Sequence, residues 1–282
     1  MTDETPPAGN VDIFCINIAG DVERRASMQR QFAPLGLPLT FVEAVEGSDI
    51  CGDLDAYGVN TGRFSLFCAR PPLRNEIACI LSHKKALTRF LEGPCDYALV
   101  LEDDAVIAGD IKAFLSNLAG IDEGYWEILR LYSKRQGKAR VVRRFADFNI
   151  TLSLKYSHGA VANCYTRRGA QKVIECFSKI YSPYDVQLGQ AWENGIGMFN
   201  VEPALFRHSG TPSRIDLQKA RGRKTGSART ATTLFSDLAW RLRGSLLKRI
   251  RFYTQILKVR RIARRAHGSA PTSTSATAGD RK

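Results

Sequence analysis

The spacing of hydrophobic and polar positions predicts alternating strands and helices along the first part of the chain. A compact apolar run predicts a strand at 11–18, and a second run predicts another at 39–45. Between them, Asp21 is a suitable N-cap for an amphipathic helix that ends at Gly36. A strand, a helix and a strand in this order predict two parallel strands joined by a right-handed crossover.

The middle of the chain contains a strand that we expect at the centre of the sheet. Residues 97–101 are five apolar residues without polar alternation, as in a parallel strand covered on both faces. The apolar positions from Ile77 to Leu91 predict a helix before this strand, with Asn75 as its N-cap and Gly93 at its end. Residues 47–74 are rich in Gly, Asp and Pro, so we expect them to be irregular.

The remaining pattern completes an α/β fold with a central, mostly parallel sheet. It predicts helices at 110–118, 168–177 and 184–192, strands at 126–132, 151–155, 159–166 and 198–201, and a basic loop at 134–144. The composition turns to Ser, Thr, Gly and basic residues from Ser209. We therefore expect a disordered start at 1–10, one folded domain at 11–215, a basic amphipathic helical tail at 216–265 and a disordered low-complexity end at 266–282.

Charge separates the tail from the folded domain. The formal net charge is +13, but residues 219–282 hold 17 basic and 2 acidic residues, whereas residues 1–218 hold 24 basic and 26 acidic ones. Within the tail, apolar residues recur near one helical face, at Leu234, Leu238, Leu242, Leu246, Ile250, Leu257 and Ile262. The basicity therefore needs an explanation separate from that of the domain.

The cysteines and the N-terminal residues indicate the cellular compartment in which we expect the protein. The seven cysteines are scattered and form no C-x-x-C pair, which argues against a structural zinc site or a disulfide framework. Residues 1–10 lack the features of a signal peptide, and no stretch approaches the roughly 20 apolar residues of a spanning helix. We expect a cytoplasmic protein that does not cross a membrane.

An acidic cluster provides the strongest candidate for chemistry. Glu102, Asp103 and Asp104 follow the buried strand directly, at the sheet edge where open α/β folds bind ligands. Carboxylates two positions apart can both reach one hard divalent cation, whose other ligands would be diphosphate oxygens and water. A solvated loop is the alternative, but three like charges at a sheet edge repel one another unless a cation joins them.

Other polar residues are candidates by position, each with a plainer alternative. Asn17 and Arg24 follow the first strand and could contact a ligand's base, ribose or phosphate, or could simply be solvated. His83 could donate to a phosphate or pack in its helix. Asp185 and His208 could act in a site or only cap and pack.

Six segments, in order, resemble glycosyltransferase family 25, the lipopolysaccharide and lipooligosaccharide biosynthesis enzymes. They read I-F-C-I-N-I-A-G-D-V-E-R-R, F-V-E-A-V-E-G, N-E-I-A-C-I-L-S-H, Y-A-L-V-L-E-D-D-A, G-A-V-A-N-C-Y-T-R-R-G-A and P-Y-D-V-Q-L, and the resemblance covers roughly residues 11 to 215. The resemblance implies a GT-A fold that binds a UDP-sugar through a divalent cation, usually manganese, with magnesium as the alternative. It also implies inverting transfer of a hexose, typically galactose, to a hydroxyl of a lipid-linked core oligosaccharide.

The resemblance also assigns roles by position. It implies Glu102 and Asp104 as metal ligands, and it places the donor against Asn17, Arg24, Glu46, Ser82, His83 and Asp103. An inverting transfer needs a base to accept the acceptor proton, for which Asp185 is our candidate. The chain departs from the family at Asn75 and Ala78, where glycines are common and space near the donor helix should narrow, and at Glu46, where aspartate is common.

The tail admits three interpretations. We favour a helix on the inner face of the cell membrane, attracted to anionic lipid, which would bring the enzyme to its acceptor. A helix packed on the domain is the second interpretation, and a lack of regularly interleaved aromatic residues disfavours nucleic acid, the third. The competing hypothesis for the whole chain is a non-catalytic membrane-surface or nucleic-acid-binding protein that acts through this tail.

Overall fold

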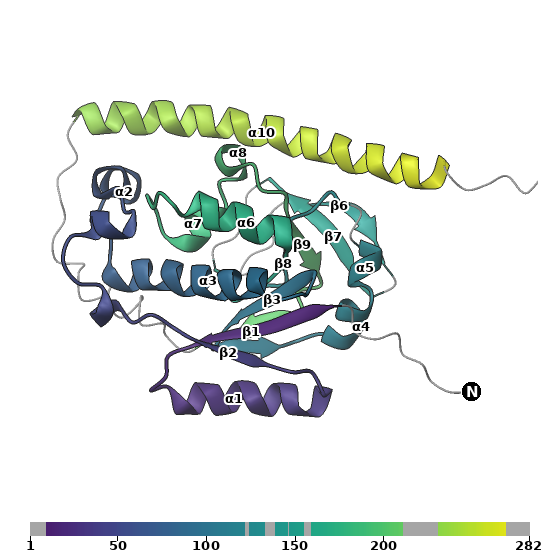
Figure 1. Ribbon diagram of the computed structural model, residues 1–282. Helices are drawn as coiled ribbons and strands as arrows, with labels where there is room; N and C mark the ends of the chain where they lie inside the picture. Colours follow the sequence, from purple (N-terminus) through teal and green to yellow (C-terminus); the bar gives the residue numbers. More distant parts are fainter. Residues whose placement is uncertain are drawn as a thin grey trace, which may run out of the picture.

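A twisted sheet of eight strands with helices on both faces forms the body of the protein (Figure 1). The computed structural model describes residues 10–121, 124–132, 139–145, 147–154, 159–210 and 231–268, without the side chains of 191–192, 231–243 and 263–268. The strand order is β2-β1-β3-β8-β5-β9-β7-β6.

The first elements confirm the predicted β-α-β opening. Strand β1 (Val11–Asn17) pairs in parallel with β2 (Thr40–Glu43) and with β3 (Tyr97–Glu102). Helix α1 (Val22–Phe32) follows Asp21, as expected, although no side-chain capping bond forms there, and a 3₁₀ turn ends at the left-handed Gly36.

The prediction of a mostly parallel sheet is wrong, because the sheet is mixed. Strand β8 (Ala162–Thr166) runs antiparallel to β3 and to β5 (Ile128–Arg130), and β7 (Asn149–Ser153) runs antiparallel to β9 (Met198–Glu202). Only β1–β2, β1–β3 and β5–β9 are parallel pairs among the described strands. A continuous apolar strand such as β8 is buried on both faces in either direction, so its hydrophobicity could not reveal its orientation.

Three further expectations need correction. The segment 47–74 contains helix α2 (Thr61–Cys68), which Asn60 caps at its N-terminus. The Asn60 side-chain oxygen accepts a hydrogen bond from the Arg63 amide at 2.8 Å. Helix α3 (Arg74–Glu92) begins after Leu73, and not at Asn75. Part of the predicted basic loop is strand β6 (Ala139–Arg144), paired antiparallel with β7, while residues 133–138 lie outside the described chain.

Three of the other elements match predicted helices: α4 (Ile111–Ser116), α6 (Arg167–Cys176) and α7 (Tyr184–Leu188), although α7 ends before residue 192. The remaining short elements were not predicted as separate ones: β4 (Ala105–Ile107), α5 (Leu118–Ile121), α8 (Ala191–Asn194) and β10 (Phe206–His208). The β4–β10 pair was not predicted. These short strands form a separate antiparallel ladder, which brings His208 opposite Ala105 at the end of the acidic cluster.

Alternating side chains of the sheet divide the core into two layers. Ile13 and Cys15 on β1 face the cluster that includes Met28 of α1, whereas Phe14 and Ile16 face the cluster built by α3, α6 and α7. The sheet is therefore covered on both sides at β1 and β3, which explains their unbroken hydrophobicity.

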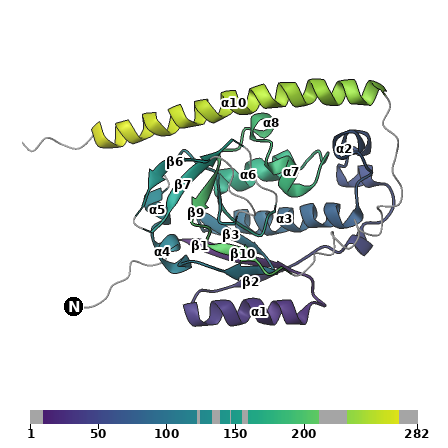
Figure 2. The same ribbon diagram turned by 180° about the vertical axis from the view of Figure 1, so that it is seen from behind.

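Helix α10 (Ala231–Gly268) crosses the outside of the body above α8 and along β6 and β7 in both views (Figures 1 and 2). Ile256 and Val259 are buried in the core, with 5% and 2% of their surface exposed, whereas Leu246 and Leu257 of the predicted apolar face are each 61% exposed. The helix thus packs on the body, as in the second interpretation, through Ile256 and Val259, which are not in the predicted apolar face, and through Ile262, which is. The segments 1–9, 211–230 and 269–282 lie outside the described residues, including the predicted disordered ends.

No helix within the described part of the chain is both long enough and apolar enough to span a bilayer.

Candidate active site

A cavity of about 470 Å³ opens at the carboxyl ends of β1 and β3, beside the N-terminal half of α3. The acidic cluster forms one side of it, and Asp21, Arg24, Glu46, Ser82 and His83 contribute to its walls. Asn75 and Ala78 also line it, so the two bulkier residues predicted to narrow the donor side do face this space. The carboxyl ends of strands are where α/β sheets bind ligands, as the sequence indicated.

Asp103 is held inside the protein by two side chains predicted to contact the donor. Its two carboxylate oxygens accept hydrogen bonds from Arg24 Nη1 at 2.8 Å and from Asn17 Nδ2 at 2.9 Å. Burial alone would lower the pKa of the Arg24 guanidinium, but the hydrogen bond and charge of Asp103 raise it above its usual value. In this structure, Asn17 and Arg24 therefore position Asp103, and their contact with a donor remains a prediction.

The surroundings of Asp104 disfavour the ionised form of its carboxylate. It is 7% exposed, and its pKa is raised to about 6 by burial first and by the charge of Glu102 second. His208 Nε2 lies 3.1 Å from Asp104 Oδ2, and the charge of His208 works against that rise. The other oxygen, Oδ1, is buried and has no hydrogen-bond partner in the described part of the protein.

These features fit a divalent cation. A buried carboxylate oxygen without a partner costs free energy unless a ligand binds it, and the adjacent imidazole and carboxylates supply further ligands. Asp104 and His208 would hold the ion, with Glu102 beside them, as metal ligands in proteins commonly do. Asp103 contributes negative charge but has both oxygens occupied by Arg24 and Asn17.

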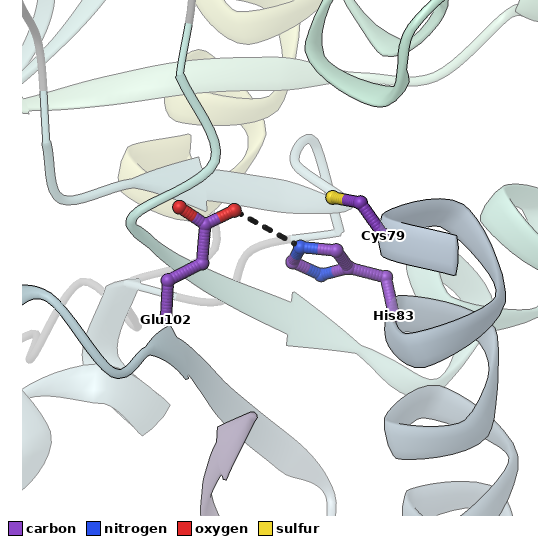
Figure 3. A group of neighbouring side chains, drawn as sticks. All are labelled: Cys79, His83 and Glu102. Carbon is purple, nitrogen blue, oxygen red and sulfur yellow. Dashed lines mark hydrogen bonds and ion pairs between the residues drawn. The ribbon is translucent and has the colours of Figure 1, made fainter. Parts of the chain in front are cut away.

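Glu102 and His83 contact each other across the cavity. The Nε2 atom of His83 lies 3.4 Å from Glu102 Oε1 (Figure 3). The His83 ring stacks on Tyr184, with the ring centroids 4.0 Å apart. The imidazole is 1% exposed, and Glu102 is 28% exposed. The plainer expectation of a packed histidine is confirmed, since the ring is buried and stacked, while a contact of its polar edge with the donor stays a prediction.

Ser82 has a structural role that the sequence did not indicate. Its hydroxyl donates to the Ala78 carbonyl at 2.7 Å and accepts from the Val45 amide at 2.9 Å. It therefore fastens α3 to the end of β2. Glu46 lies on the cavity wall and begins the 3₁₀ turn Gly47–Asp49, where its amide donates to Asp49 at 3.0 Å.

Asp185, the candidate base, lies in the first turn of helix α7 and accepts a hydrogen bond from the Gly159 amide at 2.7 Å. Its charge helps to raise the pKa of the Cys79 thiol, after burial and the larger effect of Glu102. Asp185 is therefore near the same part of α3 that faces the acidic cluster. Its role as a base remains a prediction.

His208 is the functional candidate that the sequence left undecided. It lies 104 positions beyond Asp104, and only the β4–β10 ladder brings the two together. The signal available was its place in F-R-H-S-G, just before the change in composition at Ser209. A short apolar strand ending in a histidine was not specific enough to decide between packing and ligation.

The mixed sheet, the cavity at its strand ends and the acidic cluster that lines this cavity are the arrangement of an α/β protein with a ligand site at the carboxyl ends of its strands. Comparison with known families gives the identity. The profile of "Glycosyltransferase family 25 (LPS biosynthesis protein)" matches residues 10–188, and the chain belongs to this family. The resemblance inferred from the six segments is confirmed, and the non-enzymatic alternative is set aside.

Curated relatives share the same part of the chain. Human procollagen galactosyltransferase 2 is 27% identical over 169 residues, which cover 58% of this chain and 27% of the relative. Zebrafish (Danio rerio) procollagen galactosyltransferase 1 is 24% identical over 180 residues, which cover 62% and 30%. The chain thus matches less than a third of the length of these relatives.

A solved structure was also similar. The "Crystal structure of a glycosyltransferase involved in the glycosylation of the major capsid of PBCV-1" aligns with a TM-score of 0.40 and 8% identity, over 76% of this chain and 98% of that one.

Proposed function

We propose that the protein transfers galactose from UDP-galactose to a hydroxyl of a lipopolysaccharide or lipooligosaccharide core oligosaccharide, with inversion at the anomeric carbon. Family membership supports glycosyl transfer, and the names of the relatives support galactose as the donor sugar. The observation that carries the proposal is the buried Asp104, with one oxygen beside His208 and the other without a partner among the described residues. Manganese is the cation we favour, and magnesium is the alternative.

The cavity suits the diphosphate end of such a donor. When bound by Asp104, His208 and Glu102, a divalent cation would neutralise the charge of the departing nucleoside diphosphate. Arg24, held against Asp103, keeps a further positive charge at the cavity wall. Glu46, Ser82 and the narrowing residues Asn75 and Ala78 line the rest of the donor space.

Proton transfer falls to a residue outside the acidic cluster. In an inverting reaction the acceptor hydroxyl attacks the anomeric carbon from the face opposite the diphosphate, while a base removes its proton. Glu102 and Asp104 would be occupied with the cation, and Asp103 is bonded to Arg24 and Asn17. Asp185, near the same face of α3, is therefore the residue we assign as base.

A screen of UDP-sugars without acceptor tests the donor assignment. We expect slow hydrolysis of UDP-galactose that needs manganese, and weaker hydrolysis of UDP-glucose and UDP-N-acetylglucosamine, because the cavity recognises the sugar as well as the diphosphate. Release of UDP is measured by a coupled assay, with chelator-treated protein as the control. Preference for another sugar would show that UDP-galactose is not the donor. Hydrolysis that is unaffected by chelator would show that the reaction does not need the cation.

We also propose that the outer face of α10 docks on the anionic inner surface of the cell membrane. Leu246, Ile250, Tyr253 and Leu257 are spaced by four, three and four residues, which puts them on one side of a helix, and all are at least 50% exposed. The basic residue Arg249 lies within this stretch, and Lys258, Arg260 and Arg261 follow it directly. An exposed apolar stripe among basic residues suits a lipid surface with negative headgroups.

Flotation with lipid vesicles tests the docking face. Replacing Leu246, Ile250 and Leu257 together by serine should lower binding to phosphatidylglycerol-containing vesicles at least about tenfold, because each side chain loses apolar surface that would enter the bilayer. The matched control replaces Val22 and Leu66, which are 68% and 47% exposed on other elements, and should bind like the wild type. Equal binding by both variants, or equal binding to neutral vesicles, would contradict the proposal.

A further inference from the structure

Three side chains of different chemistry converge on the cavity beside the acidic cluster. Cys79 and His83 are four residues apart on α3, so they project from the same side of that helix on successive turns, and Glu102 faces them from the end of β3. One ligand atom from each residue lies within 4.8 Å of the other two (Figure 3). All three residues line the cavity.

The set of atoms favours a particular metal. Manganese and magnesium prefer oxygen ligands, whereas zinc is bound by cysteine sulfur, histidine nitrogen and carboxylate oxygen together. Around a tetrahedral zinc ion, with bonds of about 2.0–2.3 Å, ligand atoms lie roughly 3.3–3.7 Å apart. The His83–Glu102 distance of 3.4 Å is already in this range. Only a small movement of the Cys79 side chain is needed to bring its sulfur to a similar distance from the other two ligand atoms.

The surroundings favour a cation and hold the imidazole in position. The acidic side chains of Glu102, Asp185, Glu76 and Asp104 all act on Cys79, so the sulfur lies in a region of negative potential. The stacking of His83 on Tyr184, with the rings 10° from parallel, points Nε2 at Glu102. His83 Nδ1 is buried and has no hydrogen-bond partner in the described chain, so no described acceptor or donor commits the ring to one tautomer.

We propose that Cys79, His83 and Glu102 form a zinc-binding site whose fourth position opens into the cavity, distinct from the pair Asp104 and His208. When the ion binds, the Cys79 thiol gives its proton to solvent and the thiolate, the imidazole nitrogen and the carboxylate become ligands. Three protein ligands with one open position are the arrangement of zinc sites that exchange a ligand. Zinc should therefore bind reversibly and hold water or a ligand oxygen in the cavity.

Occupancy by zinc should inhibit the transferase. The ion would draw Glu102 away from the cation at Asp104 and would fill part of the cavity that receives the donor. This consequence rests on the proposed function, whereas zinc binding itself does not.

Cobalt substitution gives a direct test on the full chain. Metal-free protein titrated with Co²⁺ should develop the near-ultraviolet charge-transfer absorption of a thiolate ligand, and one equivalent of Zn²⁺ should abolish it. Cys79→Ser should remove this absorption and weaken zinc binding, measured against a chromogenic chelator, at least about tenfold. The matched control is Cys51→Ser, which changes an exposed cysteine and should behave like the wild type.

A second variant covers the case in which Cys79→Ser does not fold. Glu102→Gln keeps the side-chain shape and should retain the thiolate absorption while binding zinc at least about tenfold more weakly. The proposal is overturned if the wild type shows no thiolate absorption with Co²⁺, or if Glu102→Gln binds zinc as tightly as the wild type. Manganese-dependent UDP binding is measured separately, so failure of the zinc site and failure of the proposed function give different results.

Discussion

Replacing Asp104 by asparagine should abolish manganese-dependent UDP binding and reduce sugar transfer by about 100-fold or more, while making the metal-free protein more stable. The functional loss follows because asparagine removes the negative charge that the cation needs at the most buried position of the cluster. Calorimetric titration of UDP with and without Mn²⁺ measures the first effect. Metal-independent UDP binding by the wild type would contradict the role assigned to Asp104.

Asp104→Asn lowers activity but should raise the free energy of unfolding, and the size of this gain depends on pH. The pKa of Asp104 rises from 3.8 to about 6 on folding, so the folded protein holds this proton more tightly than the unfolded chain. The ionised carboxylate therefore lowers the free energy of unfolding above pH 6, and this penalty fades as the pH falls towards 4. We expect the variant to be more stable by on the order of 3 kcal/mol at pH 7 and by less than about 1 kcal/mol at pH 4.

The neighbouring carboxylate provides a control for that result. Asp103→Asn should lower the free energy of unfolding of the metal-free protein, because the buried oxygens accept hydrogen bonds from Arg24 and Asn17 that a neutral amide cannot all accept. Urea denaturation at pH 4 and pH 7 compares the two variants. Stabilisation by both substitutions would show that the cluster as a whole, and not Asp104, carries the unfavourable charge.

Gly169→Ala should destabilise the protein by about 3 kcal/mol, which is the largest effect on stability that we expect from adding one methyl group. A Cβ atom at this position would lie 2.8 Å from the carbonyl carbon of Glu127, with the carbonyl oxygen nearer still. Because these are backbone atoms of the segment leading into β5, neither can rotate away. Helix α6 would have to move off the sheet, which also disturbs the Thr166 capping bond to the Gly169 amide at 3.0 Å.

Gly120→Ala is the matched control for this steric argument. Gly120 also lies in a helix, α5, but a Cβ atom there would have no heavy atom within 4 Å. Alanine should therefore be neutral or stabilise the fold by up to about 1 kcal/mol. Thermal and urea denaturation compare both variants with the wild type, and equal stability of the two would mean that α6 and β5 are packed less tightly than the structure indicates.

The sequence was most informative where one local signal decides the structure. The apolar runs at β1 and β3 and the amphipathic segment of α1 were all predicted, as was the acidic cluster at the end of β3. Strand direction was missed at β8, because direction is decided by which strands pair and not by the hydrophobicity of either one. Helix α2 was missed because eight residues between Gly, Asp and Pro give too short a periodic signal.

The candidate site shows the same division between local and long-range information. The carboxylates were found because they are consecutive in the chain, whereas His208 reaches them only through the β4–β10 ladder. The i,i+4 spacing of Cys79 and His83 was present in the sequence, but their closeness to Glu102 depends on how α3 packs against β3. Roles that depend on pairs of distant segments need the structure.

The β4–β10 ladder also has a consequence for how the protein matures. A chain still being synthesised can form β1, α1 and β3 and expose a complete acidic cluster before His208 exists, and at that stage three neighbouring carboxylates repel one another without an imidazole beside them. Tight cation binding should therefore appear only after the last strand has docked. If the cation binds as proposed, its acquisition would report that β10 has been synthesised and has docked on β4, which a fragment ending at residue 188 could not signal.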